Sequence, residues 1–381
     1  MTTISLYNPG NITFGRGSID QLVKDDISSG RKRVFLISAE AVLVKIKKQL
    51  NALQNSGIIV HTDTSLQNEP SFNDVERILA EARDFMPDTV AGIGGGSVMD
   101  LAKLIAVFTT FKEPVKNYVG SGCITERRTH LVCAPTTAGT GSEASPNAVI
   151  FDETDNTKKA FISPWLIPDA AYIDPSLALG LSAYITAYTG IDALTHCIET
   201  FANKKAHPLT DTLALKGITL ITENLLKATK NIQDIQPRIS LSLGSLYGGI
   251  CLGPVNTAAV HALAYPLGND YKIPHGLSNA ILLPYVMEFN LGAAEEKYAA
   301  IAEAIGIANN TTRRIMAIKG IAHIRRLIED CGLPVTLHDA GIKTSSIEKM
   351  AISAMEVKRL LNNNLKEVTL KDVIDIYQHA L

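Results

Sequence analysis

Cysteine is scarce in this sequence and follows no pattern that builds a scaffold. The 381 residues include five cysteines, an odd number, and no two of them form a Cys-x-x-Cys pair. A fold held together by disulfides is therefore disfavoured. The sparse cysteines indicate a reducing compartment, so we expect the protein to be cytoplasmic.

The sequence also lacks a large net charge and long apolar runs. The 36 lysines and arginines nearly balance the 38 aspartates and glutamates, for a formal net charge of −2. Such a surface argues against nucleic acid or an anionic membrane as a partner. No apolar run reaches the roughly 18 residues of a membrane span, and the first ten residues lack the basic and apolar regions of a signal peptide.

The chain has the length and the composition of an ordinary two-domain globular protein. Hydrophobic residues make up 46% and charged residues 19% of the sequence, which excludes a largely disordered chain. At about 150 residues per domain, two domains are the default expectation.

The two halves of the chain carry different patterns. Up to about residue 178, β-rich segments alternate with helical ones such as Ser71–Phe85 and Ser97–Phe108, which predicts parallel βαβ units. Later segments repeat apolar residues at helical spacing, as in Leu213–Leu226 and Ala294–Ala308. We therefore expect an α/β domain over residues 1–178 and an all-helical domain over residues 179–381. The expected strands are Val34–Ser38, Ile58–His61, Thr89–Ile93, Leu131–Ala134 and Ala171–Ile173.

A glycine-rich loop interrupts the first half. Residues 89–103 read TVAGIGGGSVMDLAK, an apolar strand that runs through glycines into a helix. Glycines let a ligand approach the backbone, and the free N–H groups of a new helix favour phosphate. Ser97 stands where the usual GxGxxG fingerprint would place its last glycine. The alternative is a tight strand-to-helix turn without a ligand.

A second small-residue loop, APTTAGTGSE, covers residues 134–143 and again follows a strand. Ligands of open α/β sheets bind at the carboxyl ends of the strands. Two such loops at one edge favour a nucleotide cofactor, although each threonine alone is as well explained as a turn or cap hydroxyl.

Histidines with a partner carboxylate mark the second half. Asp192 and His196 in GIDALTHCIET are four residues apart and share one helix face, while His261 and His275 flank a segment in which Pro266, Gly268 and Pro274 permit a turn. The apolar surroundings make burial of these groups without partners unfavourable. A shell of one carboxylate and three imidazoles suits a divalent transition metal. Taken singly, each histidine is more simply explained as a structural residue.

Together these motifs make the sequence resemble the iron-containing (group III) alcohol dehydrogenases. The similarity covers essentially the whole chain, with FGRGS, GIGGGSVMDLAK, PTTAGTGSE, IPDAAYIDPSL, TGIDALTHCIE, HALAYPLG, PHG and CGLPVTLHDAGI in order. The resemblance implies an N-terminal dinucleotide-binding α/β domain with a parallel sheet and an all-α C-terminal metal-binding domain. It also implies that cofactor and metal meet between them, and that the protein forms a homodimer or a larger homo-oligomer.

The resemblance carries site residues with it. The implied metal ligands are Asp192, His196, His261 and His275, for Fe(II) or alternatively Zn, Mn or Ni. The implied cofactor-binding residues are Gly94, Gly95, Gly96, Ser97, Asp100, Thr136, Thr137, Thr140, Ser142 and Lys158.

Two departures from the family pattern bear on the chemistry. Ala39 stands where the family often has an aspartate that binds the adenosine ribose, so that repulsion of a 2′-phosphate is lost and NADP joins NAD as an expected cofactor. Tyr265 stands where many members have a histidine near the nicotinamide. Tyrosine titrates near ~10, so we expect Tyr265 to act as a neutral hydrogen-bond donor at most.

The expected activity is metal-dependent, reversible hydride transfer between NAD(P) and a small alcohol or aldehyde. The alternatives are a glycerol or polyol dehydrogenase, a dehydroquinate-synthase-like lyase, and a non-catalytic nucleotide- or metal-binding protein. A lyase acting on a phosphorylated substrate would need several cations around the histidines. The segments there offer chiefly Lys272, which disfavours that alternative.

Overall fold

The computed structural model describes residues 3–308 and 311–381. The chain divides into two compact units. The first, called the α/β unit here, comprises Leu6–Thr137 and Gly141–Leu179. The second, called the helical unit, is built mainly from Gly180–Leu381 and includes the short stretch Ala138–Thr140.

A six-stranded sheet with every neighbouring pair parallel forms the centre of the α/β unit, in the order β1-β9-β6-β4-β2-β3. Its strands are β1 (Asn11–Phe14), β2 (Arg33–Ser38), β3 (Ile59–Asp63), β4 (Thr89–Gly94), β6 (His130–Pro135) and β9 (Ala170–Ile173). The expected parallel βαβ arrangement is therefore confirmed.

A small second sheet completes the strands of this unit. Its order is β5-β8-β7, with β5 (Gly120–Ser121), β7 (Asn147–Asp152) and β8 (Thr157–Ile162). The strands β7 and β8 form an antiparallel hairpin in which Asn156 takes a positive φ of 57° at the turn. Neither this hairpin nor the strands β1 and β5 were predicted from the sequence.

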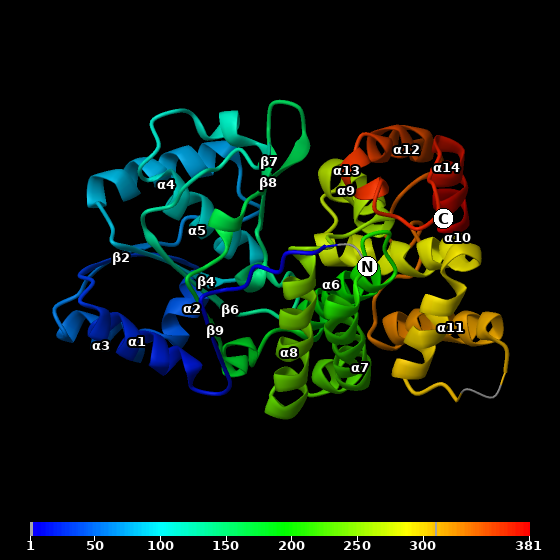
Figure 1. The fold of residues 1–381 in the computed structure, drawn as a ribbon, viewed down its shortest axis with the longest axis horizontal. Coiled ribbons are helices and arrows are strands. Elements are labelled where there is room, and N and C mark those ends of the chain that lie inside the picture. Colours follow the sequence, from blue (N-terminus) through cyan, green and yellow to red (C-terminus); the bar gives the residue numbers. More distant parts are fainter. Residues whose placement is uncertain (1–2, 309–310) are drawn as a thin grey trace. The chain divides into compact units, whose positions relative to one another are not determined.

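Alternation of side chains explains why helices cover both faces of the large sheet. Successive strand residues point to opposite faces, so Phe35 and Ile37 pack in one core cluster while Val34 and Leu36 pack in another. Figure 1 shows α4 (Phe72–Phe85) and α5 (Gly96–Phe108) on the first face. On the second face lie α1 (Ser18–Ser29) and α3 (Lys47–Asn55), and the short α2 (Glu40–Lys45) follows β2.

The helical unit consists of nine described α-helices, drawn from green to red in Figure 1. They are α6 (Ala183–Phe201), α7 (Pro208–Lys230), α8 (Ile235–Leu252), α9 (Ala259–Tyr271), α10 (His275–Ala304), α11 (Arg313–Asp330), α12 (Ile347–Met355), α13 (Lys358–Leu361) and α14 (Leu370–His379). The predicted helical second half is confirmed. Among the described helices, none combines the length and the apolar character needed to cross a bilayer.

Two details of the helical prediction are wrong. The helix expected to reach Ala308 ends at Ala304, because Gly306 with φ 89° turns the chain out of the helix. Pro266 and Gly268 do not form a turn, since both lie inside α9. The break between α9 and α10 falls at Lys272, which has a positive φ of 57°, and at Pro274.

Candidate functional site

The helix α6 presents two of the expected metal ligands on one buried face. Ser182 caps its start by accepting a hydrogen bond from the Ile185 N–H. Asp192 and His196, one turn apart, are 3% and 5% exposed. Helical spacing of four residues and an apolar environment therefore place both side chains in the core of the unit, as the sequence predicted.

The other two expected ligands come from the next helices. His261 lies in the first turn of α9, and His275 is the first residue of α10. Asp192 Oδ1 lies 3.9 Å from His196 Nε2, 3.7 Å from His261 Nε2 and 3.8 Å from His275 Nε2. One carboxylate oxygen thus faces three imidazole nitrogens at nearly equal distances.

These separations fit a single bound ion. Donor atoms about 2.1 Å from one tetrahedral ion lie roughly 3.4 Å from one another. One donor atom each from Asp192, His261 and His275 lie within 4.8 Å of one another, so these three form a possible metal-binding group. His196 stands beside this group, with its ring stacked on that of His261 at 4.8 Å between centroids.

The contacts of Asn279 indicate that the acceptor atoms of Asp192, His261 and His275 lack a positively charged partner. Its amide nitrogen lies 2.8 Å from Asp192 Oδ1, 3.2 Å from His261 Nε2 and 3.4 Å from His275 Nε2. Two amide hydrogens cannot satisfy three converging acceptors. The amide oxygen of Asn279 is itself buried without a partner. A cation bound among these acceptors fits the donor set better than the amide alone.

The electrostatics of the cluster favour the forms that bind metal. Burial by itself raises the pKa of Asp192, but the imidazoles of His196, His275 and His261 hold that pKa below its ordinary value. Burial also lowers the pKa of His196, in spite of the nearby carboxylate. An ionised aspartate and a neutral imidazole are the ligand forms required.

Glycines allow the helices to approach closely enough. A Cβ atom on Gly276, next to His275, would lie 2.4 Å from the Tyr188 carbonyl oxygen and 3.1 Å from Asp192 Cβ. A Cβ on Gly248 in α8 would lie 3.2 Å from His196 Cβ. Without side chains at these positions, α6 packs against its neighbours at a distance that brings the four ligands together.

Two polar residues of this cluster, Glu199 and Asn279, were not predicted from the sequence. Glu199 accepts a hydrogen bond from His261, with 2.6 Å between Glu199 Oε2 and His261 Nδ1. It stands seven residues after Asp192, a spacing that returns to the same helix face. Asn279 stands four residues after His275 in the same way. Both residues could have been found by looking along the same helix face for the next polar residues after His196 and after His275.

The α/β unit has its own candidate site, at the carboxyl ends of β2 and β4. Chain order runs outward from β2 to β3 on one side, and from β4 to β6 and β9 on the other. The topological switch point therefore lies between β2 and β4, where doubly wound sheets bind their ligands. Ala39 follows β2 and the glycine loop follows β4, so both meet at this edge.

The glycine loop is shaped by close packing of strand and helix. A Cβ on Gly94 would lie 2.7 Å from Val98 Cβ, and α5 begins at Gly96 directly after the loop. The expected residues of the second loop adjoin it. The Thr136 N–H donates to the Gly94 carbonyl at 2.9 Å, and a Cβ on Gly95 would be 3.8 Å from Thr137 Oγ1. The free N–H groups at the start of α5 thus face an edge where a phosphate could bind.

Other residues expected at the cofactor form contacts within the protein. Asp100 accepts hydrogen bonds from Ser142 Oγ at 2.5 Å and from the Val149 N–H at 2.9 Å. Lys158, with its side chain only 6% exposed, forms an ion pair with Glu69 at 2.6 Å. Thr140 belongs to the helical unit, whereas Ser142 belongs to the α/β unit.

A buried lysine that the sequence analysis did not single out holds this edge together. Lys103 Nζ donates to the carbonyls of Ser145 at 3.0 Å and Asn147 at 2.8 Å and lies 3.9 Å from Asp100 Oδ1. Burial lowers the pKa of Lys103, and the Asp100 carboxylate opposes that shift. A lysine between the apolar residues Ala102 and Leu104 of α5 was the signal in the sequence.

Tyr265, the expected proton-handling residue, lies on α9 one turn after His261. Its ring centroid is 6.1 Å from that of His275. The structure therefore brings Tyr265 to the edge of the metal cluster, within the same unit.

Comparison with known proteins covers both units. A model of iron-containing alcohol dehydrogenases matches residues 9–175, and a model of the C-terminal part of the Fe-containing alcohol dehydrogenase family matches residues 186–381. Long-chain-alcohol dehydrogenase 1 of Geobacillus thermodenitrificans is 37% identical over 373 residues, covering 96% of this chain and 94% of that protein.

Further relatives agree in sequence and in structure. The 1,3-propanediol dehydrogenase of Klebsiella pneumoniae is 34% identical over 343 residues, covering 88% of each protein. A crystal structure of a 1,3-propanediol oxidoreductase matches all of this chain and all of its own, with a TM-score of 0.96 and 32% identity.

Proposed function

Because the chain belongs to the family of iron-containing alcohol dehydrogenases, we propose that it transfers hydride reversibly between a small alcohol or aldehyde and NAD(H) or NADP(H). As an oxidoreductase of this family, it interconverts alcohols and aldehydes. The observation that carries the proposed mechanism is that Asp192 Oδ1 lies 3.7–3.9 Å from Nε2 of His196, His261 and His275, and that Asp192, His261 and His275 form a possible metal-binding group.

In this proposal Asp192, His196, His261 and His275 hold a divalent metal, most simply Fe(II), with Zn, Mn and Ni as alternatives. When bound, such an ion supplies Lewis-acid polarisation of the substrate oxygen. The helices α6, α9 and α10 fix the four ligands before substrate arrives. Their burial excludes water from all but the His275 side of the cluster, since the His275 side chain is 27% exposed.

The nicotinamide cofactor is proposed to bind at the switch point between β2 and β4. The N–H groups after Gly95 and Gly96 would hold the pyrophosphate, and Thr136, Thr137, Thr140 and Ser142 would line the nicotinamide. Asp100 keeps Ser142 in place through their hydrogen bond at 2.5 Å. Tyr265, beside His275, would donate a hydrogen bond at the substrate end.

The substrate class is supported by the names of relatives, whereas the assembly is proposed from the family resemblance and the location from the sparse cysteines. Two relatives are named for 1,3-propanediol and lactaldehyde, which supports a small alcohol or aldehyde here, whereas a third is named for long-chain alcohols. We further propose a dinucleotide-binding domain over residues 1–178, a metal-binding catalytic domain over residues 179–381, a homodimer or larger assembly, and a cytoplasmic location.

The test follows NADH and NADPH absorbance anaerobically with a panel of short aldehydes. Protein is compared as purified, after chelation, and after addition of Fe(II), Zn, Mn or Ni. We expect activity to disappear on chelation and to return with one metal, and His261→Ala to abolish it. The matched control is His338→Ala, because the His338 side chain is 81% exposed.

Two outcomes contradict the proposal. Turnover that persists in chelated protein without bound metal would remove the metal from the mechanism. A protein that binds metal but turns over neither cofactor with any aldehyde would favour the lyase or the non-catalytic binding protein.

A further inference from the structure

The carboxylate of Glu199 is buried behind the metal cluster and is held at both oxygens. Oε2 lies 2.6 Å from His261 Nδ1, and Oε1 accepts the Val260 N–H at 2.6 Å. Glu199 and His261 are each 4% exposed. The contact therefore joins two fully enclosed side chains and has the short length of a charge-assisted hydrogen bond.

This contact determines which nitrogen of His261 faces the cluster. An acceptor at Nδ1 keeps the proton on that atom, so that Nε2 presents a lone pair. That Nε2 is the atom 3.7 Å from Asp192 Oδ1. The ring is thus oriented, and its tautomer set, for a ligand on the Asp192 side.

The ion-pair partners of Glu199 bear on how a negative charge on its carboxylate is balanced. Among residues 3–308 and 311–381, no lysine or arginine forms an ion pair with Glu199, whose sole ion-pair partner is His261. An isolated buried carboxylate is strongly unfavourable. A divalent cation on the far nitrogen of His261 would supply the missing positive charge through the imidazole.

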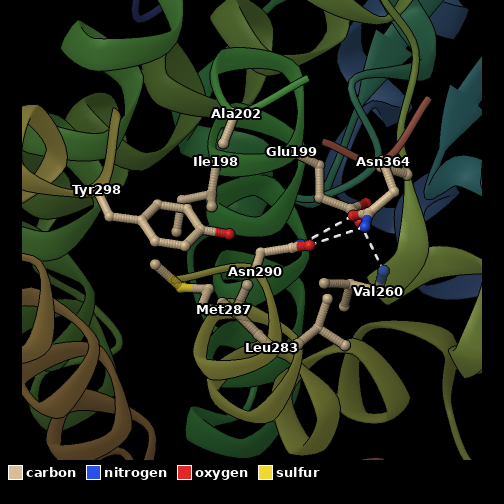
Figure 2. A pocket seen from close by; sticks show the side chains of 11 residues that line it. Ile198, Glu199, Ala202, Val260, Leu283, Met287, Asn290, Tyr298 and Asn364 are labelled. Atoms are coloured by element: carbon tan, nitrogen blue, oxygen red, sulfur yellow. Dashed lines mark hydrogen bonds between the residues drawn. The ribbon is translucent and has the colours of Figure 1, made fainter. Parts of the chain in front are cut away.

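A small cavity lies on the other side of Glu199, and none of the described residues that line it is cationic. It has a volume of about 10 Å³ and is lined by Glu199, apolar side chains of α6 and α10, and the neutral polar residues Asn290, Tyr298 and Asn364. Figure 2 shows Asn290 and Asn364 joined by paired hydrogen bonds, both of 2.8 Å. Because these two amides bind each other, a positive charge that balances Glu199 would have to come from the side of His261.

We infer that Glu199 is a positioning residue for the metal, which acts by orienting the His261 ring and by holding the proton on its Nδ1, so that Nε2 faces the metal. The inference rests on the proposed function, because it requires a metal at the four ligands. Carboxylates that hold a ligating histidine in this way typically contribute 10–100-fold to metal affinity. Glu199 would then govern how tightly the enzyme keeps its metal, without touching the metal or the substrate.

The experiment measures metal affinity directly. The purified enzyme and its Glu199→Gln variant are stripped with chelator and titrated with Zn²⁺, and the Co²⁺-loaded forms are compared by visible absorption. Glutamine keeps the shape and one acceptor oxygen but removes the charge. We expect a 10–100-fold higher Kd for Zn²⁺ and shifted Co²⁺ bands. Glu199→Asp, which retains the charge on a shorter side chain, should fall between the two and serves if Glu199→Gln does not fold.

Two controls separate the possible failures. Asn290→Ala changes the lining of the same cavity but removes no proposed metal ligand. We expect it to keep the wild-type Kd for Zn²⁺ and to melt at a lower temperature. Wild-type affinity and spectrum in Glu199→Gln, or an equal loss in Asn290→Ala, would overturn the role of Glu199 alone. If His261→Ala bound Zn²⁺ as tightly as the wild type, the metal assignment would fail and this inference with it.

Discussion

The proposed metal cluster of the helical unit and the proposed cofactor edge of the α/β unit are built by different means. In the helical unit, side chains from three helices converge on one point and find too few partners there, as the shared amide of Asn279 shows. At the cofactor edge, side chains such as Asp100 and Ser142 satisfy one another and leave the backbone to face a ligand. In the proposed metal site the ligand would be held by side chains that lack other partners. In the proposed phosphate site it would be held by backbone N–H groups.

The largest effect should come from removing the lysine that holds the cofactor edge. Lys103→Met leaves the Ser145 and Asn147 carbonyls and the Asp100 carboxylate without their buried cation. Breaking a buried pair in this way costs about 3–5 kcal/mol, which corresponds to a fall of roughly 10 °C in Tm. Calorimetry measures the change in Tm. Lys112→Met is the control, because Lys112 is exposed.

The same variant tests the contrast between the two sites. Zinc affinity, measured well below the transition temperature, should stay at its wild-type value, because Lys103 belongs to the α/β unit. A Lys103→Met protein with unchanged Tm would show that the buried cation is not needed there. Loss of zinc affinity would show that the two sites are not independently built.

The next largest effect concerns the approach of α10 to α6. Gly276→Ala places a Cβ 2.4 Å from the Tyr188 carbonyl, so the helix must shift and carry His275 with it. A displacement of about 1 Å at a catalytic group lowers the rate roughly 100-fold. We expect that loss in kcat together with reduced metal content.

Gly292→Ala provides a matched control in the same helix. A Cβ on Gly292 meets nothing within 4 Å, so this variant should keep its activity and gain slightly in stability. If Gly276→Ala retained metal and rate at wild-type levels, close helix approach would not be what assembles the cluster.

The two units also differ in how much of their structure could be predicted from the sequence. Four-residue spacing on a helix is a local property, so Asp192 and His196 could be paired from the sequence alone. The strands of the parallel sheet could be recognised by their continuous apolar character, as in β4. The β7–β8 hairpin was missed because its apolar residues stand in short consecutive runs, Ala148–Phe151 and Ala160–Ile162, and do not alternate with polar residues.

Long-range partners could not be predicted. Nothing local in the sequence relates Lys158 to Glu69, or Glu199 to His261, which lie 89 and 62 residues apart. Proline and glycine were also ambiguous. Pro266 was interpreted as part of a turn, yet it sits inside α9, where tertiary packing overrides its usual effect.

A smaller effect should appear in the pH dependence of stability. Burial raises the pKa of Glu143 to about 7, from an ordinary value of 4.5. Because the folded state binds this proton more tightly, the stabilisation is complete below about pH 4.5 and is lost as the pH rises through 7. Glu143→Gln should therefore match the wild type near pH 5 and melt a few degrees higher at pH 8.

Thermal melts across this pH range provide the measurement. Glu126→Gln is the control, because the Glu126 side chain is 46% exposed. A difference between Glu143→Gln and the wild type that stays constant from pH 5 to 8 would show that Glu143 does not titrate in this range.

Cofactor preference should respond to position 39 by about tenfold. Ala39 follows β2 at the switch point, so Ala39→Asp would place a carboxylate where a ribose 2′-hydroxyl binds and a 2′-phosphate is repelled. The ratio of kcat/KM for NADH over NADPH should rise about tenfold, or ~1.4 kcal/mol. Ala41→Asp on the exposed side of α2 should leave it unchanged. If the ratio does not move in Ala39→Asp, position 39 does not select the cofactor.

The smallest effect is expected at Tyr265, which lies beside the metal cluster but contributes no ligand. Its ring is 6.1 Å from that of His275, and an ordinary tyrosine stays protonated until about pH 10. Tyr265→Phe should therefore lower kcat about fivefold, the effect of one hydrogen bond of ~1 kcal/mol, and leave the pH–rate profile in place. Tyr271→Phe at the end of α9 is the control. An unchanged kcat would reduce Tyr265 to a packing residue, whereas loss of a limb of the pH profile would make it a proton-transfer group and extend the site beyond its metal ligands.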